Sequence, residues 1–149
     1  MTESVFSRLH GHYLEDLSEG MSAVVAKTIT DADVTLFAGV SGDTNPLHIN
    51  EEFAAETRFK TRIVHGMLTT SLWSTLIGTQ LPGPGCAYLK QETTFTRPVH
   101  AGDTVTATVT VARIDHNKQR VHLDCECTVF EEPVAVGKAV VWVPRRTAK

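Results

Sequence analysis

Asp43 and His48 are the residues of this chain whose types and spacing best suit proton transfer. A carboxylate and an imidazole held close together can take a proton from water and return one to a substrate. The two residues stand five positions apart, and Gly42, Asn45 and Pro46 around them favour a turn over a helix. We therefore expect a catalytic pair on a rigid turn, although the same residues also form an ordinary Asx-turn without any chemistry.

Short helices are expected on both sides of this turn. Thr30 is a suitable N-cap, and the acidic residues and helically spaced apolar residues that follow it predict a first helix. This helix should end between Gly39 and Gly42, which leaves Asp43 in the loop just past its C-terminus. Asn50 is placed to cap a second short helix.

The segment 67–79 predicts a long helix, because its residues are apolar or small on almost every face. A helix of this composition is covered by protein on most sides. The sequence Leu-Pro-Gly-Pro-Gly at 81–85 ends it. That glycine-rich segment lacks the Lys-Ser/Thr of a phosphate-binding P-loop, so we interpret it as a connector.

Alternating apolar and polar residues predict five strands, and the clearest pattern lies in 104–114, where apolar residues alternate with threonines. The predicted strands span 22–29, 86–95, 104–114, 120–130 and 134–143. We expect an α+β fold in which an antiparallel sheet, with the last four strands meandering, wraps around the long helix. A sheet of this size covers one side of the helix, so an exposed edge or face should pair with a second copy.

The composition indicates an ordinary soluble globular protein, with 42% hydrophobic and 21% charged residues in a chain of 149. We expect residues 1–20 to form an N-terminal arm that packs only in places, and 21–149 to form a single domain. A net charge of -3 gives no global field for nucleic acid or for an anionic membrane. Because no signal peptide or bilayer-spanning apolar run is present, we expect a cytoplasmic protein.

Cysteine and histidine usage gives no metal or disulfide framework. Cys86, Cys125 and Cys127 are an odd and sparse set, and the last two should share one side of a strand as small buried hydrophobes. His10 and His12 are two potential ligands, but no third ligand stands near them.

The segment from Phe37 to His48, followed by Ala54 and by Ile63-Val64-His65-Gly66-Met67, resembles the MaoC-like family of R-specific enoyl-CoA hydratases, also called hydratase 2. The family pattern Gly-Asp-x-Asn-Pro-Leu-His is matched at every defined position, and the similarity runs from about Met21 to Val143. The resemblance implies the hotdog fold and a homodimer or a multiple of dimers. It also implies a lyase of fatty acid metabolism that reversibly hydrates trans-2-enoyl-CoA to (R)-3-hydroxyacyl-CoA.

Such a hydration requires a base for the water that attacks C3, an acid for C2, and a donor for the charge on the thioester oxygen. We expect Asp43 and His48 to supply the first two, and which of them is the base stays open. Gly66 stands at the start of the long helix, where backbone N–H groups are unpaired. The resemblance implies that the Gly66 N–H polarises the thioester carbonyl, which makes Gly66 the third catalytic residue.

The resemblance implies supporting roles for three more residues. Ser74 matches a serine that supports the catalytic aspartate, Asn45 matches a residue that positions the loop, and His65 fits the family pattern before Gly66. Each also has an ordinary structural interpretation, as a helix-surface serine, an Asx-turn and a capping or packing histidine.

Candidate substrate-binding residues are large apolar side chains in and near the long helix, namely Phe53, Met67, Leu68, Leu72, Trp73 and Leu76. Basic residues near the motif are candidates for the phosphates of coenzyme A, and the sequence does not choose among Arg58, Lys60, Arg62, Lys90 and Arg97. Coenzyme A is part of the substrate. We expect no metal, nucleotide or redox cofactor.

Two other functions fit the same fold. A hotdog thioesterase would direct water at the carbonyl carbon, but such enzymes do not usually contain the motif that runs from Gly42 to His48. A non-catalytic acyl-CoA-binding protein would be expected to lack the acid/base pair, and both members are present. Acyl chain length, pathway and the choice between coenzyme A and acyl carrier protein stay open.

Overall fold

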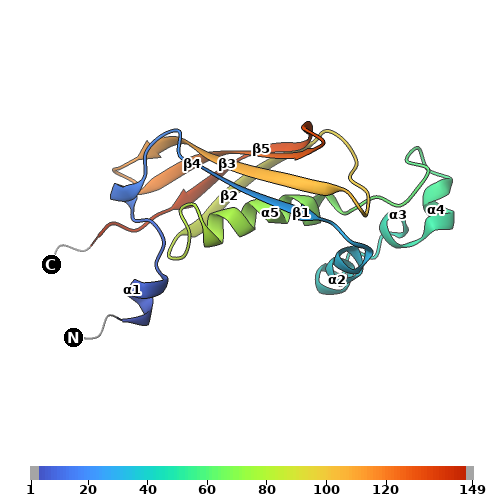
Figure 1. Ribbon diagram of the computed structural model, residues 1–149, viewed down its shortest axis with the longest axis horizontal. Coiled ribbons are helices and arrows are strands. Elements are labelled where there is room, and N and C mark those ends of the chain that lie inside the picture. The colour runs from blue at the N-terminus through green and yellow to red at the C-terminus, as the bar shows by residue number, and fades with distance from the viewer. Residues whose placement is uncertain (1–3, 147–149) are drawn as a thin grey trace.

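A five-stranded antiparallel sheet is the main layer of the molecule (Figure 1). The computed structural model describes residues 4–146. The strands lie side by side in the order β1-β3-β4-β5-β2, with bounds β1 (Ser22–Thr28), β2 (Ala87–Phe95), β3 (Thr104–Asp115), β4 (Arg120–Val129) and β5 (Glu132–Trp142). This arrangement confirms the expected α+β class and all five predicted strands.

The position of β2 differs from the expected meander of four strands. Strands β3, β4 and β5 do meander, but β2 pairs with β5 at one edge of the sheet, and β1 pairs with β3 at the other. Alternation predicts that a segment is a strand but does not identify its neighbour. β5 also begins earlier than expected, because the turn before it is centred on Phe130 and Glu131, both with left-handed backbone.

Helix α5 (Gly66–Thr79) lies across one face of the sheet and contacts β3 most extensively (Figure 1). Its Trp73 and Leu76 are fully buried in the core that α5 shares with the sheet, and the Trp73 indole N–H donates to the Glu126 carbonyl at 3.1 Å. Each such burial stabilises the fold by about 1.5–3 kcal/mol. The opposite face of α5 exposes Ser74 and Thr75, so the helix is less enclosed within one chain than its composition predicts.

Three helices lie between β1 and α5, namely α2 (Asp31–Ser41), α3 (Pro46–Ile49) and α4 (Glu51–Ala55). Thr30 caps α2 as predicted. Its side chain accepts from the Asp33 N–H at 3.2 Å, and the Asp33 carboxylate accepts from the Thr30 N–H at 2.8 Å. Gly42 ends α2 in the left-handed region with φ of 77°, and Asn50 caps α4 as predicted.

The N-terminal segment packs against the connector that follows α5. It contains α1 (Val5–Leu9) and the 3-10 turn η1 (Leu14–Asp16). The backbone N–H groups of Gly11 and His12 each donate at 2.8 Å, to the carbonyls of Pro84 and Pro82. Leu14 and Leu17 belong to the core cluster. The division into an arm of 1–20 and a domain of 21–149 stays a prediction, and residues 1–3 and 147–149 lie outside the described chain.

The three cysteines are free, and Cys125 and Cys127 are buried on the same face of β4 as predicted. Burial raises the pKa of both thiols to about 12, so neither is a ready nucleophile. The Nδ1 of His12 lies 3.1 Å from the Pro82 carbonyl oxygen, and within residues 4–146 the one group of three potential metal ligands contains neither His10 nor His12.

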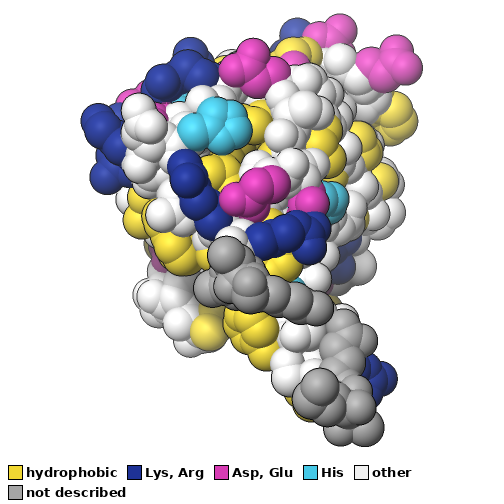
Figure 2. All heavy atoms as spheres, turned by 90° about the vertical axis from the view of Figure 1, so that its left-hand side faces the viewer, with side chains coloured by type: hydrophobic (Ala, Val, Ile, Leu, Met, Phe, Trp, Pro, Cys, Tyr) yellow, Lys and Arg dark blue, Asp and Glu magenta, His cyan; other side chains and the backbone are white. Residues whose placement is uncertain are grey.

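The end of the molecule near both termini has charges of both signs. Figure 2 shows Lys and Arg side chains interspersed there with Asp and Glu. Arg146 pairs with Asp16, and the backbone N–H of Arg146 donates to the Glu15 carboxylate at 3.1 Å. This face therefore presents no uniformly basic surface of the kind that nucleic acid requires. Within residues 4–146, every helix is too short or too polar to cross a bilayer.

Candidate active site

The loop after α2 presents Asp43 to solvent. Its backbone N–H donates to the Ser41 hydroxyl at 3.1 Å, and its Oδ1 accepts from the Asn45 N–H at 3.2 Å. These bonds fix the backbone and one carboxylate oxygen. The second oxygen, Oδ2, has no hydrogen-bond partner among the described residues, so it is available to a ligand.

His48 lies on α3, where a turn was expected and a single helical turn is found. Asn45 caps this turn by accepting from the Leu47 N–H at 3.0 Å, and Pro46 occupies the first helical position. His48 is only 8% exposed, and its Nδ1 lies 2.8 Å from the Ile63 carbonyl oxygen. Because a carbonyl only accepts, Nδ1 holds the hydrogen, and in the neutral ring Nε2 presents a lone pair.

His65 has the opposite hydrogen position and is 1% exposed. Its Nε2 lies 2.9 Å from the backbone carbonyl oxygen of Asp43, so Nε2 donates and anchors the loop. Its Nδ1 is buried and has no hydrogen-bond partner within the described chain. The ring also packs 4.9 Å from that of Phe37, centroid to centroid, so α2 helps to hold it.

Asp43, His48 and His65 converge, with one polar side-chain atom of each lying within 4.8 Å of the others. They form the one group of potential metal ligands that the structure places together in residues 4–146. The centroids of the two imidazole rings are 3.9 Å apart, and the ring planes are tilted by 32°. A carboxylate and two imidazoles at this separation can exchange protons.

Gly66 begins α5 directly after His65, and no side chain caps this end of the helix. The first N–H groups of a helix lack partners within it and attract negative charge. A Cβ at position 66 would lie 2.6 Å from the ring of Phe95. Any larger residue here would have to displace the Phe95 ring, and glycine leaves the N–H of this position open to a ligand.

A cavity of about 330 Å³ joins these groups. Asp43, His48, His65 and Gly66 all line it, together with residues from the end of β2 and the segment after α4. The cavity thus presents a carboxylate, an imidazole lone pair and a helix N-terminus to the same space. This combination suits the addition or removal of water next to a carbonyl group.

A model described as the MaoC like domain matches residues 15–131. The chain belongs to the MaoC-like family.

Relatives of this family support the assignment over nearly the whole chain. The (R)-specific enoyl-CoA hydratase of Rhodospirillum rubrum is 53% identical over 135 residues, which cover 91% of this chain and 94% of the relative. The 3-hydroxybutyryl-CoA dehydratase of Methylorubrum extorquens is 45% identical, over 90% of this chain and 85% of the relative. The family resemblance predicted from the sequence is confirmed.

A solved MaoC-like structure has the same fold. The (R)-hydratase from A. caviae involved in PHA biosynthesis superposes with a TM-score of 0.84 and 42% identity, over 87% of this chain and 99% of that one. This confirms the hotdog fold expected for the chain.

The predicted apolar walls of the MaoC-like cavity are only partly where they were expected. Met67 lines the cavity. Leu72, Trp73 and Leu76 instead pack in the core, because they lie on the α5 face that meets the sheet. Leu68 is half-buried and packs against that core, and Phe53 on α4 is 49% exposed; neither lines the cavity.

The supporting residues of the MaoC-like site fall into two groups. His65 and Asn45 both contact the Asp43 loop, through the hydrogen bonds described above. Ser74 is exposed on α5, outside the cavity lining, and its hydroxyl forms no hydrogen bond within the described chain. Its expected support of Asp43 stays a prediction.

Phe59 and Phe95 line the cavity and were not predicted as site residues. Phe95 packs on Gly66 from the end of β2, and Phe59 follows α4. No local signal identifies either one, since Phe95 stands in an alternating strand pattern and reaches Gly66 only through the fold. Phe95 can be recognised as a site residue only when the positions of β2 and α5 relative to one another are known.

Proposed function

We propose that this protein catalyses the reversible hydration of trans-2-enoyl-CoA to (R)-3-hydroxyacyl-CoA. The observation that supports the proposal most directly is the single cavity shared by Asp43, His48 and the N-terminus of α5 at Gly66. The names of the most similar relatives describe the same chemistry in both directions, as a hydratase and as a dehydratase. The R configuration of the product is proposed from those names.

The thioester oxygen accepts a hydrogen bond from the Gly66 N–H in this mechanism. Negative charge grows on that oxygen as water adds to C3, and a fixed donor at a helix N-terminus stabilises it without reorganisation. Loss of one such donor typically costs about 10²- to 10³-fold in rate.

The attacking water sits between Asp43 and His48. The free carboxylate oxygen of Asp43 and Nε2 of His48 both accept from it, because Nδ1 of His48 is committed to the Ile63 carbonyl. The hydroxyl forms a bond to C3, and the proton that water loses passes through the pair to C2. The double bond between C2 and C3 becomes a single bond. The product therefore retains all the atoms of one water molecule, with the hydroxyl on C3 and the proton on C2.

Assembly and context are proposed from the fold. β1 and β2 are edge strands, each with one unpaired side, and Val24 and Leu89 on them are exposed. Edges of this kind favour pairing with a second copy, so we propose a homodimer or a multiple of it. We further propose a cytoplasmic role in fatty acid metabolism, without a metal or redox cofactor, since protein groups can supply each step above.

The test is an assay with purified protein and crotonyl-CoA. Loss of the enoyl thioester absorbance, coupled to a dehydrogenase that accepts only the (R)-3-hydroxyacyl product, is the expected result. Thiol release is measured in parallel, because only thioester hydrolysis produces free coenzyme A. Thiol release without the coupled signal, or no reaction across a panel of enoyl-CoA chain lengths, would overturn the proposal.

A further inference from the structure

The candidate basic residues for the phosphates of coenzyme A differ in whether a carboxylate already neutralises their charge. They are Arg58, Lys60, Arg62, Lys90 and Arg97. Arg62 contacts two carboxylates, those of Asp31 at 3.1 Å and Glu51 at 3.0 Å. Lys90 pairs with Glu92 on the surface of β2. Two carboxylates therefore hold Arg62, and neither Arg62 nor Lys90 lines the cavity that Asp43 and His48 share.

Arg58 and Arg97 are the two basic residues that line the catalytic cavity. Both are exposed, whereas His48 in the same lining is buried, so the arginines stand where the cavity opens to solvent. They come from separate parts of the chain, one after α4 and one after β2. Lys60 is exposed but does not line the cavity.

Arg58 has no carboxylate partner among the described residues. Its guanidinium carbon lies 4.8 Å from the centroid of the Phe59 ring, and Phe59 also lines the cavity. An arginine stacked on an aromatic ring keeps its charge and its hydrogen-bond donors while losing some freedom of movement. Arg58 is therefore a pre-oriented cation at the opening of the cavity.

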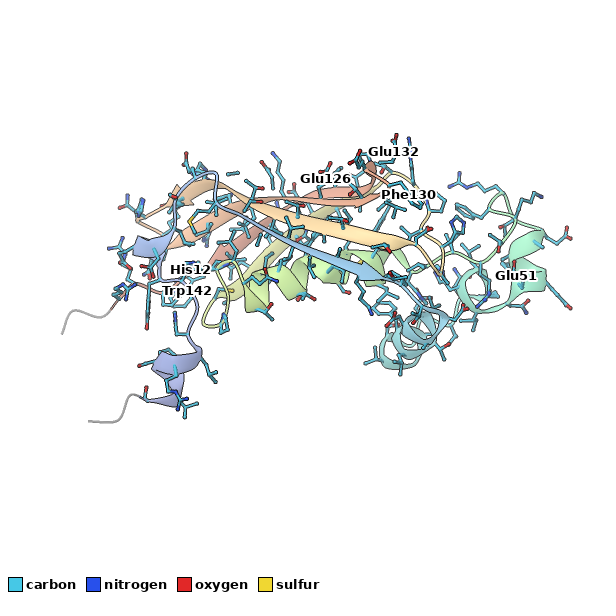
Figure 3. All side chains as sticks on the ribbon, in the orientation of Figure 1. His12, Glu51, Glu126, Phe130, Glu132 and Trp142 are labelled. Carbon is cyan, nitrogen blue, oxygen red and sulfur yellow. The ribbon has the colours of Figure 1, made fainter. Side chains whose placement is uncertain are left out.

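Arg97 is partly neutralised. It pairs with Glu132 at 3.0 Å, and both side chains are more than half exposed. Such a surface pair is weak and is easily exchanged for a better anion. Glu132 lies at the β4–β5 turn, toward the end of the sheet where α4 and Glu51 lie (Figure 3).

We propose that Arg58 and Arg97 bind the phosphate groups at the far end of the substrate's pantetheine arm. This inference rests on the proposed function, since a thioester held at Gly66 places that arm along the cavity and its phosphates outside the opening. Arginine forks match phosphate oxygens with paired, charge-assisted hydrogen bonds. The same phosphate chemistry belongs to coenzyme A and to the phosphopantetheine of acyl carrier protein.

The test compares thioesters with and without phosphate. Arg58→Gln should raise KM for crotonyl-CoA about tenfold and leave kcat unchanged, as expected when one charge-assisted interaction that is equal in ground and transition states is lost. Arg97→Gln should raise KM less, about threefold, because Glu132 already holds part of its charge. KM for crotonyl-pantetheine, which has no phosphate, should not change in either variant.

Two further variants sharpen the test. Glu132→Gln frees Arg97 and should lower KM for crotonyl-CoA about twofold to threefold. Arg120→Gln is the matched control, because Arg120 is exposed at the start of β4, at the opposite end of that strand from the β4–β5 turn. Crotonyl-acyl carrier protein is assayed beside crotonyl-CoA, and the carrier with the higher wild-type kcat/KM is the source of the phosphate.

Unchanged KM for both carriers in Arg58→Gln and Arg97→Gln would overturn the proposal, as would an equal rise of KM with crotonyl-pantetheine. If the wild-type protein hydrates none of the thioesters, the proposed function has failed. Calorimetric titration with free coenzyme A then tests the phosphate site without turnover. Weaker binding of free coenzyme A by Arg58→Gln than by Arg120→Gln would support the site. Equal binding by these two variants would refute it.

Discussion

Each histidine of the site is fixed by a backbone carbonyl, and the two are fixed in opposite senses. His48 donates from Nδ1 to Ile63, and His65 donates from Nε2 to Asp43. One ring therefore presents its free nitrogen at Nε2 and the other at Nδ1. The arrangement separates two tasks in the proposed mechanism, in which His48 acts on the water and His65 holds the loop that presents Asp43.

Asp43→Asn and His48→Gln are expected to lower kcat by about 10²- to 10⁴-fold each, because each removes one partner of the proton transfer. The measurement is crotonyl-CoA hydration by variants whose circular dichroism matches the wild type. His116→Gln, in the exposed β3–β4 turn, is the control and should retain activity. A folded variant with near-normal turnover would remove that residue from the mechanism.

His65 is expected to act as a positioning residue. His65→Leu removes the donor to the Asp43 carbonyl and should lower kcat about fivefold while KM changes little, since a net hydrogen bond is worth about 1 kcal/mol. His65→Gln keeps an amide donor and should recover part of the loss. Steady-state kinetics of both variants test this. Equal activity of the two would mean that the hydrogen bond is not what His65 contributes.

The site residues that could be predicted from sequence are those whose chemistry is local. The turn around Asp43, the start of α5 at Gly66 and the pair with His48 follow from residue types and from the family pattern. Trp73 could not be placed, because its burial depends on which face of α5 meets the sheet. Phe95 could not be found, because its contact with Gly66 joins two elements that the sequence does not align.

Among the elements, α2 owes its start to the reciprocal bonds between Thr30 and Asp33. The pKa of the Asp33 carboxyl is lowered below its ordinary value of 3.8, mostly by the hydrogen bond from the Thr30 backbone N–H. The hydrogen bond from the Thr30 hydroxyl is the second cause. A carboxyl group with a lowered pKa in the folded state stabilises the fold above its ordinary pKa, and the contribution is lost as the pH falls.

Asp33→Asn should therefore destabilise the protein at pH 7, and its deficit relative to the wild type should shrink below about pH 4. Thr30→Ala should cost about 1 kcal/mol at pH 7. Urea unfolding at pH 7 and in acid measures both. Asp124→Asn on the outer face of β4 is the control. A deficit for Asp33→Asn that does not change with pH would contradict the capping argument.

The strands show where local pattern stops being informative. The alternation in β3 predicts its buried face correctly, with Val105, Ala107, Val109 and Val111 all inside. The same pattern cannot tell that β2 pairs with β5, because that pairing is set by the path of the segment 96–103 across the end of the sheet. Long-range topology is thus the part of the fold that composition and periodicity leave undetermined.

For the whole molecule, we expect a homodimer or a multiple of it, since both edges of the sheet and one face of α5 are open in a single chain. Size-exclusion chromatography with light scattering should give at least twice the chain mass of 16.3 kDa. A species of 16.3 kDa at micromolar concentration, with full hydratase activity, would contradict this expectation.

The two ends of the described chain lie at the same end of the sheet, away from α3 and α4 (Figure 1). The catalytic cavity is lined by His48 of α3 and so belongs to the opposite end. A protein fused at either end would start its path far from the opening through which substrate enters. The fold is therefore well suited to tethering, for example on a scaffold that holds it beside an enzyme that consumes its product.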